Sequence, residues 1–187
     1  MVITRSLPQL DYRLCVAVNQ WSTGHAIVVG FFGTVSRLGD GLFWYALMVG
    51  LASFNGARGM HAVVHMLCTG LVALLLYRCL KRWTRRPRPF RSCERIRASV
   101  APLDEFSFPS GHTLHAVSFS IVALAYFPAL APALLPFAAL VAASRVVLGL
   151  HYPSDVLAAL AIGVGIGETS LWLGSSMTMF ASAQGLG

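Results

Sequence analysis

Apolar residues occur in long blocks, and short polar, glycine-containing or proline-containing stretches separate these blocks. The blocks cover residues 24–36, 41–54, 60–80, 112–127, 131–149 and 154–174. Because a helix needs about 20 mostly apolar residues to cross a bilayer, repeated blocks of this kind are typical of membrane-spanning helices. The pattern therefore predicts an all-α fold, a polytopic membrane helix bundle with about six transmembrane helices.

The first two blocks are short for full spans, and only a glycine-containing turn at residues 36–41 separates them. They predict either two tilted spans or one re-entrant pair. Ahead of them, residues 7–21 mix apolar and polar positions and predict an amphipathic helix at the membrane interface. We expect one domain over residues 1–187, in which 1–23 is an interfacial segment. Residues 81–111 are expected to form a loop on the side of the membrane where the motifs described below meet, which is called the catalytic side.

Composition and charge support a membrane protein with an anionic ligand. Hydrophobic residues make up 56% of the chain and charged residues 11%, whereas a soluble domain carries roughly 25% charged residues. The net charge is +7, and eight of the 14 Lys and Arg residues lie between Lys81 and Arg97. Because this basic run connects two apolar blocks, we expect lipid headgroups or a phosphorylated lipid as its partners, and not nucleic acid. No obligate protein partner is predicted.

Three short motifs lie at the ends of the apolar blocks. They are Lys81-x6-Arg88-Pro89, Pro109-Ser110-Gly111-His112 and Ser144-Arg145-x5-His151-x3-Asp155. One block ends at the first motif, one begins at the second, and the third connects two blocks. Since successive spans alternate in direction, all four ends lie on the same side of the membrane. The motifs are therefore predicted to form one site.

The third motif contains a pair suited to nucleophilic catalysis. Asp155 lies four residues after His151, which is one helical turn away on the same face. A carboxylate there can accept the imidazole N–H and leave the other ring nitrogen free to attack. Taken alone, the pair is equally typical of a histidine that begins a helix beside a favourable acid.

The cations of the motifs match the needs of phosphoryl transfer. Arg88 and Arg145 supply planar forks that can bind two phosphate oxygens, and Lys81 adds a point charge. Fixed cations stabilise the charge that spreads over the transferring phosphoryl group. The remaining basic residues of the loop are better explained as arginines at headgroup depth: Arg82, Arg85, Arg86, Arg91, Arg95 and Arg97.

The second motif opens an apolar block. Ser110 and Gly111 stand at its start, where a helix presents unpaired N–H groups to an anion. His112, at the same edge, can protonate a leaving group. By itself this four-residue match is also typical of an ordinary helix cap.

For other polar residues in or near the blocks, the sequence gives weaker evidence of a functional role. His115 either faces the same cavity as His112 or is a packed helix histidine, and we favour the second. His61 and His65 have a spacing that could bind a metal, but they begin a block on the opposite side, so an interfacial role is preferred. Arg37 and Asp40 are expected on the catalytic side, where they pair with each other or shape the substrate entrance.

The glycines at 163, 165 and 167 have no predicted strand before them, so a dinucleotide site is not expected. Small residues that allow close helix packing explain them better.

The three motifs resemble the signature of the type 2 phosphatidic acid phosphatase superfamily, which also includes glucose-6-phosphatase and vanadium-dependent haloperoxidases. That signature reads KxxxxxxRP, PSGH and SRxxxxxHxxxD, and residues 81–155 match every fixed position. The resemblance implies that His151 is a nucleophile that forms a phosphohistidine, that Asp155 orients it and that His112 is the general acid. It assigns phosphate binding to Lys81, Arg88, Ser110, Gly111 and Arg145. It also implies catalysis without a metal ion or other cofactor.

The small size and short loops resemble bacterial members that process lipid phosphates. Undecaprenyl diphosphate is the preferred substrate, and phosphatidylglycerol phosphate, phosphatidic acid and lipid A are alternatives. A haloperoxidase-like oxidoreductase is disfavoured because those relatives are soluble, and a non-catalytic membrane protein is the remaining alternative.

The chain is expected in the bacterial inner (plasma) membrane. Six spans with a cytoplasmic N-terminus would place the site at the periplasmic or outer face, whereas the basic loop argues for the opposite orientation under the positive-inside rule. Labelling of Cys93 with an impermeant reagent is expected to distinguish the two.

Overall fold

The computed structural model describes the backbone of residues 3–183 and the side chains of residues 9–176, and every regular element in that part is helical. The order is α1 (Ile3–Thr23), α2 (Ala26–Arg37), a π-helical turn (Leu38–Leu42), α3 (Phe43–Phe54), α4 (Gly56–Thr84), α5 (Pro89–Ser92), α6 (Gly111–Tyr126), a 3-10 turn (Pro128–Leu130), α7 (Ala131–Val147) and α8 (Pro153–Ala183). The predicted all-α class is confirmed.

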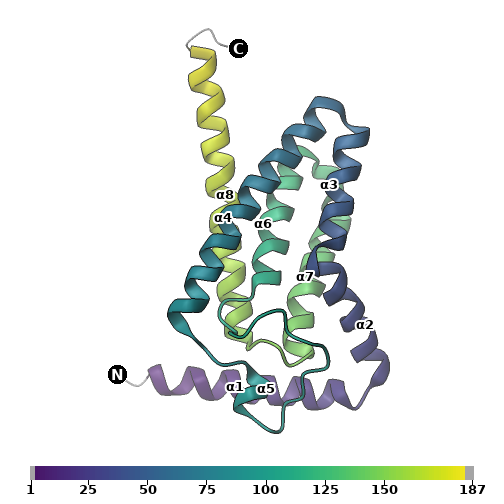
Figure 1. The fold of residues 1–187 in the computed structure, drawn as a ribbon, viewed down its shortest axis with the longest axis vertical. Helices are drawn as coiled ribbons and strands as arrows, with labels where there is room; N and C mark the ends of the chain where they lie inside the picture. Colours follow the sequence, from purple (N-terminus) through teal and green to yellow (C-terminus); the bar gives the residue numbers. More distant parts are fainter. Residues whose placement is uncertain (1–2, 184–187) are drawn as a thin grey trace.

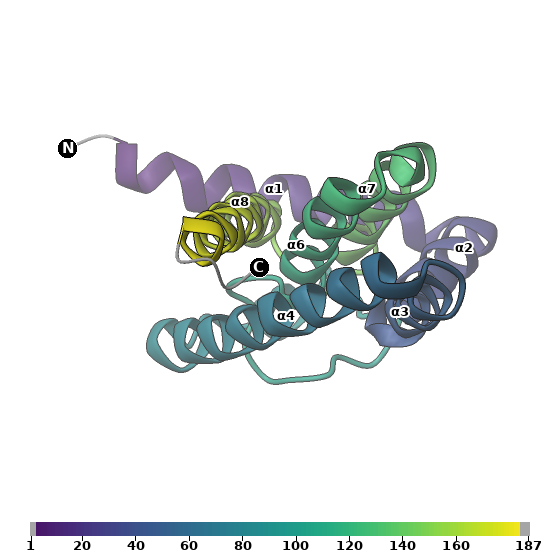
Figure 2. The same cartoon turned by 90° about the horizontal axis from the view of Figure 1, so that it is seen from above.

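Helix α6 lies at the centre of the bundle and packs against α4, α7 and α8 (Figures 1 and 2). Its inward residues are small or apolar, and Leu114, Ala116, Val122 and Ala123 are fully buried. Because the other long helices surround α6, its N-terminal end is held within the protein. The second motif sits at that end.

Four helical stretches of the described chain are long and apolar enough to cross a membrane. They are Ala26–Phe54, Gly56–Ser92, Pro128–Val147 and Pro153–Ser176. Helix α6 has 16 residues and runs among them as a shorter helix. The chain is therefore an integral membrane protein, and the expected count of about six transmembrane helices is approximate.

The first two apolar blocks form a single helical rod and not two spans or a re-entrant pair. Helices α2 and α3 both run away from the end crossed by α1 and join at a bend in the π-helical turn, without a reversal of the chain (Figure 1). Gly41 has a φ of 139°, which a residue with a side chain adopts only with strain, so the glycine allows a kink without a reversal. The glycine-containing turn therefore bends the rod, and it exposes Asp40 at the kink.

Helix α1 crosses the end of the bundle where the motifs lie (Figure 1). Its polar residues Asp11, Asn19 and Ser22 are buried against the protein, while Leu10 and Trp21 are exposed. Three polar residues of α1 thus pack inward, together with Cys15 and Val16. The N-terminal helix lies on the catalytic side, so the premise that the N-terminus and the site are on opposite sides is wrong.

Buried amides and hydroxyls connect α1 to the motif loops. The Asn19 side-chain amide donates to the carbonyl oxygens of Arg97 and Val147, at 3.0 and 3.3 Å, and its oxygen accepts the Arg97 N–H at 2.8 Å. Ser22 also donates to the Val147 carbonyl, at 2.9 Å. These bonds hold the end of α7 and the loop after α5 against one helix, and thereby position two of the three motifs.

Glycines on α8 allow its close approach to α6. A Cβ atom at Gly163 would lie 2.9 Å from the carbonyl oxygen of Leu114, and one at Gly167 would lie 2.9 Å from Ile121. A Cβ at Gly165 would contact nothing within 4 Å. Two of the three glycines therefore serve close helix packing, as small residues do in membrane bundles.

Candidate active site

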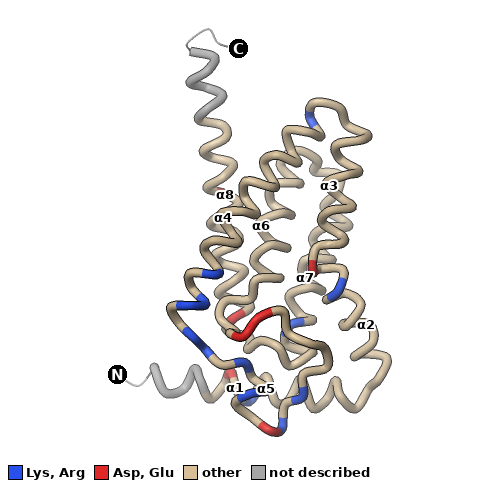
Figure 3. Tube along the Cα trace, in the orientation of Figure 1, with Lys and Arg blue, Asp and Glu red and all other residues tan. Residues whose placement is uncertain are grey.

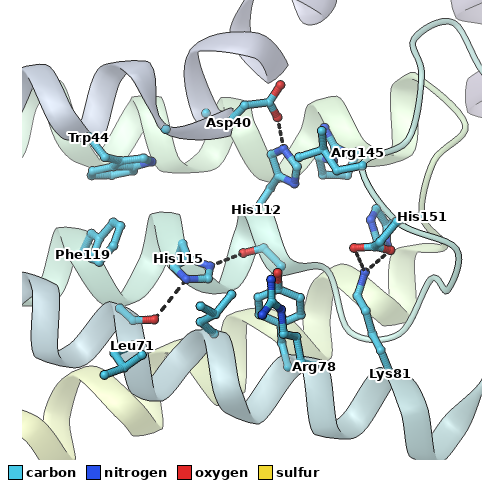
Figure 4. A pocket seen from close by; sticks show the side chains of 18 of the residues that line it. Asp40, Trp44, Leu71, Arg78, Lys81, His112, His115, Phe119, Arg145 and His151 are labelled. Atoms are coloured by element: carbon cyan, nitrogen blue, oxygen red, sulfur yellow. Dashed lines mark hydrogen bonds and ion pairs between the residues drawn. The ribbon is translucent and has the colours of Figure 1, made fainter.

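The three motifs converge on one cavity of about 940 Å³ at the end of the bundle crossed by α1. Its polar end is lined by Lys81, Arg88, His112, Arg145 and His151, and Gly111 also borders it. Figure 4 shows Lys81, His112, Arg145 and His151 around a common space. Ser110 and Asp155 are fully buried directly behind the lining. The structure thus brings all the sequence-predicted site residues together.

The turn after α7 positions His151. Helix α7 ends at Val147, and Gly149 then adopts a φ of 72°. A Cβ atom there would lie 2.7 Å from the carbonyl oxygen of Arg97, so the turn requires glycine. The N–H groups of Leu150 and His151 both donate to the Arg145 carbonyl at 3.0 Å. The imidazole is therefore held on a short, fully bonded turn.

The contacts of the His151 ring indicate its tautomer. The Arg88 Nη1 atom lies 3.3 Å from Nε2. Arginine can only donate, so Nε2 accepts and the proton of the neutral ring is assigned to Nδ1. Burial, followed by the charges of Arg145 and Arg88, holds the pKa of His151 well below its ordinary 6.5. The ring is neutral at pH 7, and Nε2 faces the cations of the cavity.

Asp155 faces His151 without a hydrogen bond to it. The distance from Nδ1 to Asp155 Oδ2 is 3.6 Å, which is too long for a hydrogen bond. The carboxylate instead accepts the Tyr152 N–H at 2.9 Å and an Arg86 N–H at 2.6 Å. The expected bond is not formed because two other donors already hold the carboxylate. Catalytic hydrogen bonds of this kind often tighten only in the substrate complex.

Arg86 forms the central contact behind the site, and its interpretation as an arginine at headgroup depth is wrong. Its guanidinium lies 2.6 Å from both Asp155 and Asp11, and 2.7 Å from Ser154. It also lies over the Tyr152 ring, 4.2 Å from the centroid. Asp11 in turn accepts the Ser154 N–H at the start of α8, at 2.9 Å. Arg86 therefore links α1, the basic loop and α8.

Lys81 and Arg88 share a carboxylate that sequence reasoning missed. Both oxygens of Asp104 lie 2.6 Å from Lys81 Nζ, and one of them lies 2.8 Å from Arg88 Nη2. Burial opposes ionisation of Asp104, but the hydrogen bonds and charges of Lys81 and Arg88 lower its pKa below the ordinary value. The carboxylate is ionised and lies on two cations assigned to phosphate. No spacing rule connects Asp104 to the motifs, because it approaches through an irregular loop.

Arg145 is an almost completely buried cation without a carboxylate partner among the described residues. It is 2% exposed, and its one hydrogen-bonded neighbour there is the hydroxyl of Ser36. Its Nε atom has no partner. A buried guanidinium with free donors that borders a cavity is suited to binding an anion.

The start of α6 presents the second motif to the cavity. Ser110 is the N-cap, and its hydroxyl accepts the Thr113 N–H at 3.4 Å. His112 follows one residue into the helix, and its Nε2 contacts Asp40 at the kink between α2 and α3 (Figure 4). Asp40 therefore pairs with His112 and not with Arg37. Its partner could not be inferred from the sequence, because the kink brings together residues 72 positions apart.

The other histidines lie away from the reacting groups or are packed. The ring nitrogens of His115 face the carbonyl oxygens of Gly111 and Gly70, at 2.9 and 3.3 Å, which fits a packed helix histidine at the cavity wall. His65 contacts the Tyr126 hydroxyl at 3.2 Å. Among the residues described, no group of three His, Cys, Asp or Glu side chains could hold a metal ion.

Away from the cations, the cavity becomes apolar. It continues between α3, α4 and α6 along Trp44, Met48, Leu67, Leu71, Leu74 and Phe119. Leu67 and Leu71 are more than half exposed in the membrane-spanning part of α4. One space thus joins a cationic end to an apolar wall that opens towards the lipid.

The family model described as the PAP2 superfamily matches residues 59–177, which include all three motifs. The chain belongs to the PAP2 superfamily. The resemblance inferred from the motifs is therefore confirmed. Its curated PAP2 relatives differ in the lipid named for each.

An undecaprenyl-diphosphatase of Bacillus subtilis is 30% identical over 66% of this chain and 64% of its own length. A lipid A 1-phosphatase of Rhizobium johnstonii is 38% identical over 48% of this chain and 38% of its own length. Phosphatidylglycerophosphatase B of Bacillus subtilis is 32% identical over 70% of this chain and 67% of its own length. This chain thus spans less than two thirds of the first two relatives.

Two solved membrane structures have the same architecture. Aquifex aeolicus LpxE superimposes with a TM-score of 0.71 at 27% identity, over 85% of this chain and 93% of LpxE. The PAP2-type phosphatidylglycerolphosphate phosphatase of Bacillus subtilis gives 0.68 at 23% identity, over 92% of this chain and 88% of that one. The second likeness shows the fold alone.

Proposed function

We propose that this PAP2 protein is a membrane phosphohydrolase that removes a terminal phosphate from a lipid through a phosphohistidine. The observation that carries the proposal is one cavity in which a neutral His151 faces Lys81, Arg88 and Arg145, and which continues into an apolar wall. The cationic end fits a phosphate, and the apolar end fits a hydrocarbon chain.

In the first step, His151 Nε2 attacks phosphorus and the bond from phosphorus to the lipid oxygen breaks. His112 gives its proton to that oxygen, and the cations stabilise the charge on the phosphoryl oxygens. In the second step, water attacks the phosphohistidine and returns a proton to His112, and inorganic phosphate leaves. Asp155, which Arg86 holds in place, is positioned to accept the Nδ1 proton of His151 and to orient the ring when their 3.6 Å separation shortens in the substrate complex.

Undecaprenyl diphosphate is the preferred substrate in this proposal. The Bacillus subtilis undecaprenyl-diphosphatase supports this choice, because its 30% identity extends over 124 residues. Lipid A, phosphatidylglycerol phosphate and phosphatidic acid remain the alternatives, because relatives named for the first two are of similar identity.

A phosphate-release panel tests the proposal. Purified protein is assayed with undecaprenyl diphosphate, phosphatidylglycerol phosphate, phosphatidic acid and lipid A, and His151→Gln serves as the control for contaminating phosphatases. We expect release from at least one lipid, fastest from the diphosphate, and loss of release in His151→Gln. Equal release by the wild type and the variant would contradict the proposal.

The site is proposed to face the periplasm or outside of an inner (plasma) membrane. Lys and Arg gather at the catalytic end (Figure 3), and of the described residues Arg58 is the one at the far end. The positive-inside rule would place such an end in the cytoplasm. Four of these basic residues are held in ion pairs within the fold: Lys81, Arg86, Arg88 and Arg91. This pairing gives the loop a structural reason to be basic.

Cysteine labelling in intact cells decides the orientation. Cys93 is a poor probe because it is buried and contacts the Tyr12 hydroxyl at 2.9 Å. Exposed alanines at both ends offer a matched pair, Ala98→Cys on the catalytic side and Ala57→Cys on the far side. An impermeant thiol reagent is expected to label Ala98→Cys alone. Labelling of Ala57→Cys alone would show that the site faces the cytoplasm.

A further inference from the structure

One face of α4 lines the cavity along most of its length, and the chemistry of that face changes in order. Leu67, Leu71 and Leu74 line the apolar part, and Arg78 and Lys81 follow them towards the catalytic end. These residues are three or four positions apart, so they lie on the same side of the helix. Figure 4 shows Arg78 rising from α4 between His115 and Lys81, below His112.

Two arginines that line the cavity, Arg78 and Arg82, have a free head group in the described part of the chain, and Arg78 is the one that lies between the leucines and Lys81 along α4. Within the described part of the chain, its guanidinium makes no hydrogen bond or ion pair. Arg88 is bound to Asp104 and to the Leu150 carbonyl, and Arg145 contacts Ser36. A charged residue in a membrane-spanning helix that faces a cavity marks a functional position. Arg78 thus presents an unused fork to whatever occupies the middle of the cavity.

We propose that Arg78 binds the inner phosphate of a lipid diphosphate, and that it makes the site selective for diphosphates over monophosphates. This inference rests on the proposed phosphohydrolase function and names its substrate class. A lipid diphosphate consists of a chain, an inner phosphate and a terminal phosphate, in the same order as the leucines, Arg78 and Lys81 along α4. At a rise of 1.5 Å per residue, Arg78 lies about 4.5 Å before Lys81 along the helix.

The leaving group explains why this position matters for the reaction. When His151 attacks the terminal phosphorus of a diphosphate, the bond to the bridging oxygen breaks and a lipid monophosphate departs. The added negative charge develops on the inner phosphate, where the Arg78 fork can bind two oxygens. With a lipid monophosphate, the departing group is an alcohol that lacks an inner phosphate, so Arg78 has no anion to bind.

The test compares two substrates that share one prenyl chain, a prenyl diphosphate and the corresponding prenyl monophosphate, in the same detergent micelles. The kcat/KM value is measured on both for the wild type, Arg78→Gln, Arg78→Lys and Arg97→Gln. Arg97 is the matched control because it is exposed on the same side and does not line the cavity. Thermal unfolding in detergent checks that each variant is folded.

We expect Arg78→Gln to lower the ratio of diphosphate to monophosphate kcat/KM by about tenfold or more, as for the loss of one charge-assisted hydrogen bond. Arg78→Lys keeps the charge, so its ratio should fall less than that of Arg78→Gln. Arg97→Gln should leave the ratio unchanged. A ratio within twofold of the wild type in folded Arg78→Gln overturns the inference, whether both rates fall together or neither falls. Failure of the wild type on both substrates would instead refute the proposed function itself.

Discussion

Asp104 holds Lys81 through both of its carboxylate oxygens, each 2.6 Å from Nζ. The same carboxylate lies 2.8 Å from Arg88, so a pair of oxygens occupies two cations that are assigned to phosphate. A carboxylate in this position resembles two oxygens of a bound phosphate. The substrate must therefore displace Asp104 from at least part of this contact.

Replacing Asp104 should strengthen the binding of phosphate analogues. Its lowered pKa keeps the carboxylate charged at neutral pH, so it competes with an anion for Lys81 and Arg88. In Asp104→Asn we expect the inhibition constant of vanadate to fall by about tenfold, the value of one lost charge-assisted contact. Glu105→Gln is the matched control, since Glu105 pairs with the exposed Arg91. Weaker inhibition in Asp104→Asn would instead mean that the carboxylate orients the cations productively.

The neutral state of His151 predicts how activity and stability depend on pH on the acid side of neutrality. Its pKa in the fold lies well below 6.5 because of burial and of the charges of Arg145 and Arg88. The ring therefore remains unprotonated as the pH falls through 6.5, whereas the unfolded chain takes up a proton there. Activity should persist below pH 6.5, while the contribution of this group to stability is lost as the pH falls from 6.5 towards the folded pKa.

Removal of one cation next to His151 should shift the pH at which activity is lost on the acid side. In Arg88→Gln the imidazole loses one of the charges that disfavour its protonation, so the acid limb of kcat/KM should shift to higher pH, although the rate also falls. Both proteins are measured on one substrate, so that titration of the substrate affects both curves equally. An unchanged or lower midpoint would show that His151 does not set the acid limb.

The contact between Arg86 and Asp155 should contribute to stability as well as to catalysis. Asp155 is fully buried, so Arg86→Gln leaves its carboxylate without a cation. Breaking a buried pair in this way costs about 3 kcal/mol. We expect a lower unfolding temperature in detergent and a coupling between Arg86→Gln and Asp155→Asn in a double-mutant cycle. Strictly additive effects would show that the contact is not energetically coupled.

Close packing of α8 on α6 predicts a contrast between neighbouring glycines. Gly163→Ala places a methyl group 2.9 Å from a backbone oxygen, which cannot move aside as a flexible side chain can. Gly165→Ala meets nothing within 4 Å and gains about 1 kcal/mol of helix propensity. Thermal unfolding should therefore show a destabilised first variant and an unchanged or stabilised second. Equal effects would contradict the packing role.

The sequence predicted the parts of this site that local chemistry determines. Apolar blocks located the helices, and the alternation of spans predicted that residues as distant as Lys81 and His151 meet. The kink at Gly41 could not be foreseen, because glycine is equally typical of a turn that reverses the chain. As a result the expected count of about six spans is approximate, and the N-terminus was expected at the end of the bundle opposite the site.

The supporting residues were harder to find because their partners are distant in sequence. Asp11, Asp40 and Asp104 lie outside the motifs and reach them through a crossing helix, a kink and an irregular loop. Arg78 is different. Its position three residues before Lys81 places it on the same helical face, so the spacing alone could have indicated it.

The most direct test of the proposed mechanism is whether phosphate from the substrate becomes covalently bound to His151. Protein is mixed with a lipid diphosphate that carries a radioactive terminal phosphate, quenched in alkali within milliseconds to seconds, and digested for peptide analysis. A phosphohistidine intermediate predicts an alkali-stable, acid-labile label on the peptide that contains His151, and no label in His151→Gln. Turnover of the substrate by His151→Gln, or a label on another residue, would contradict it.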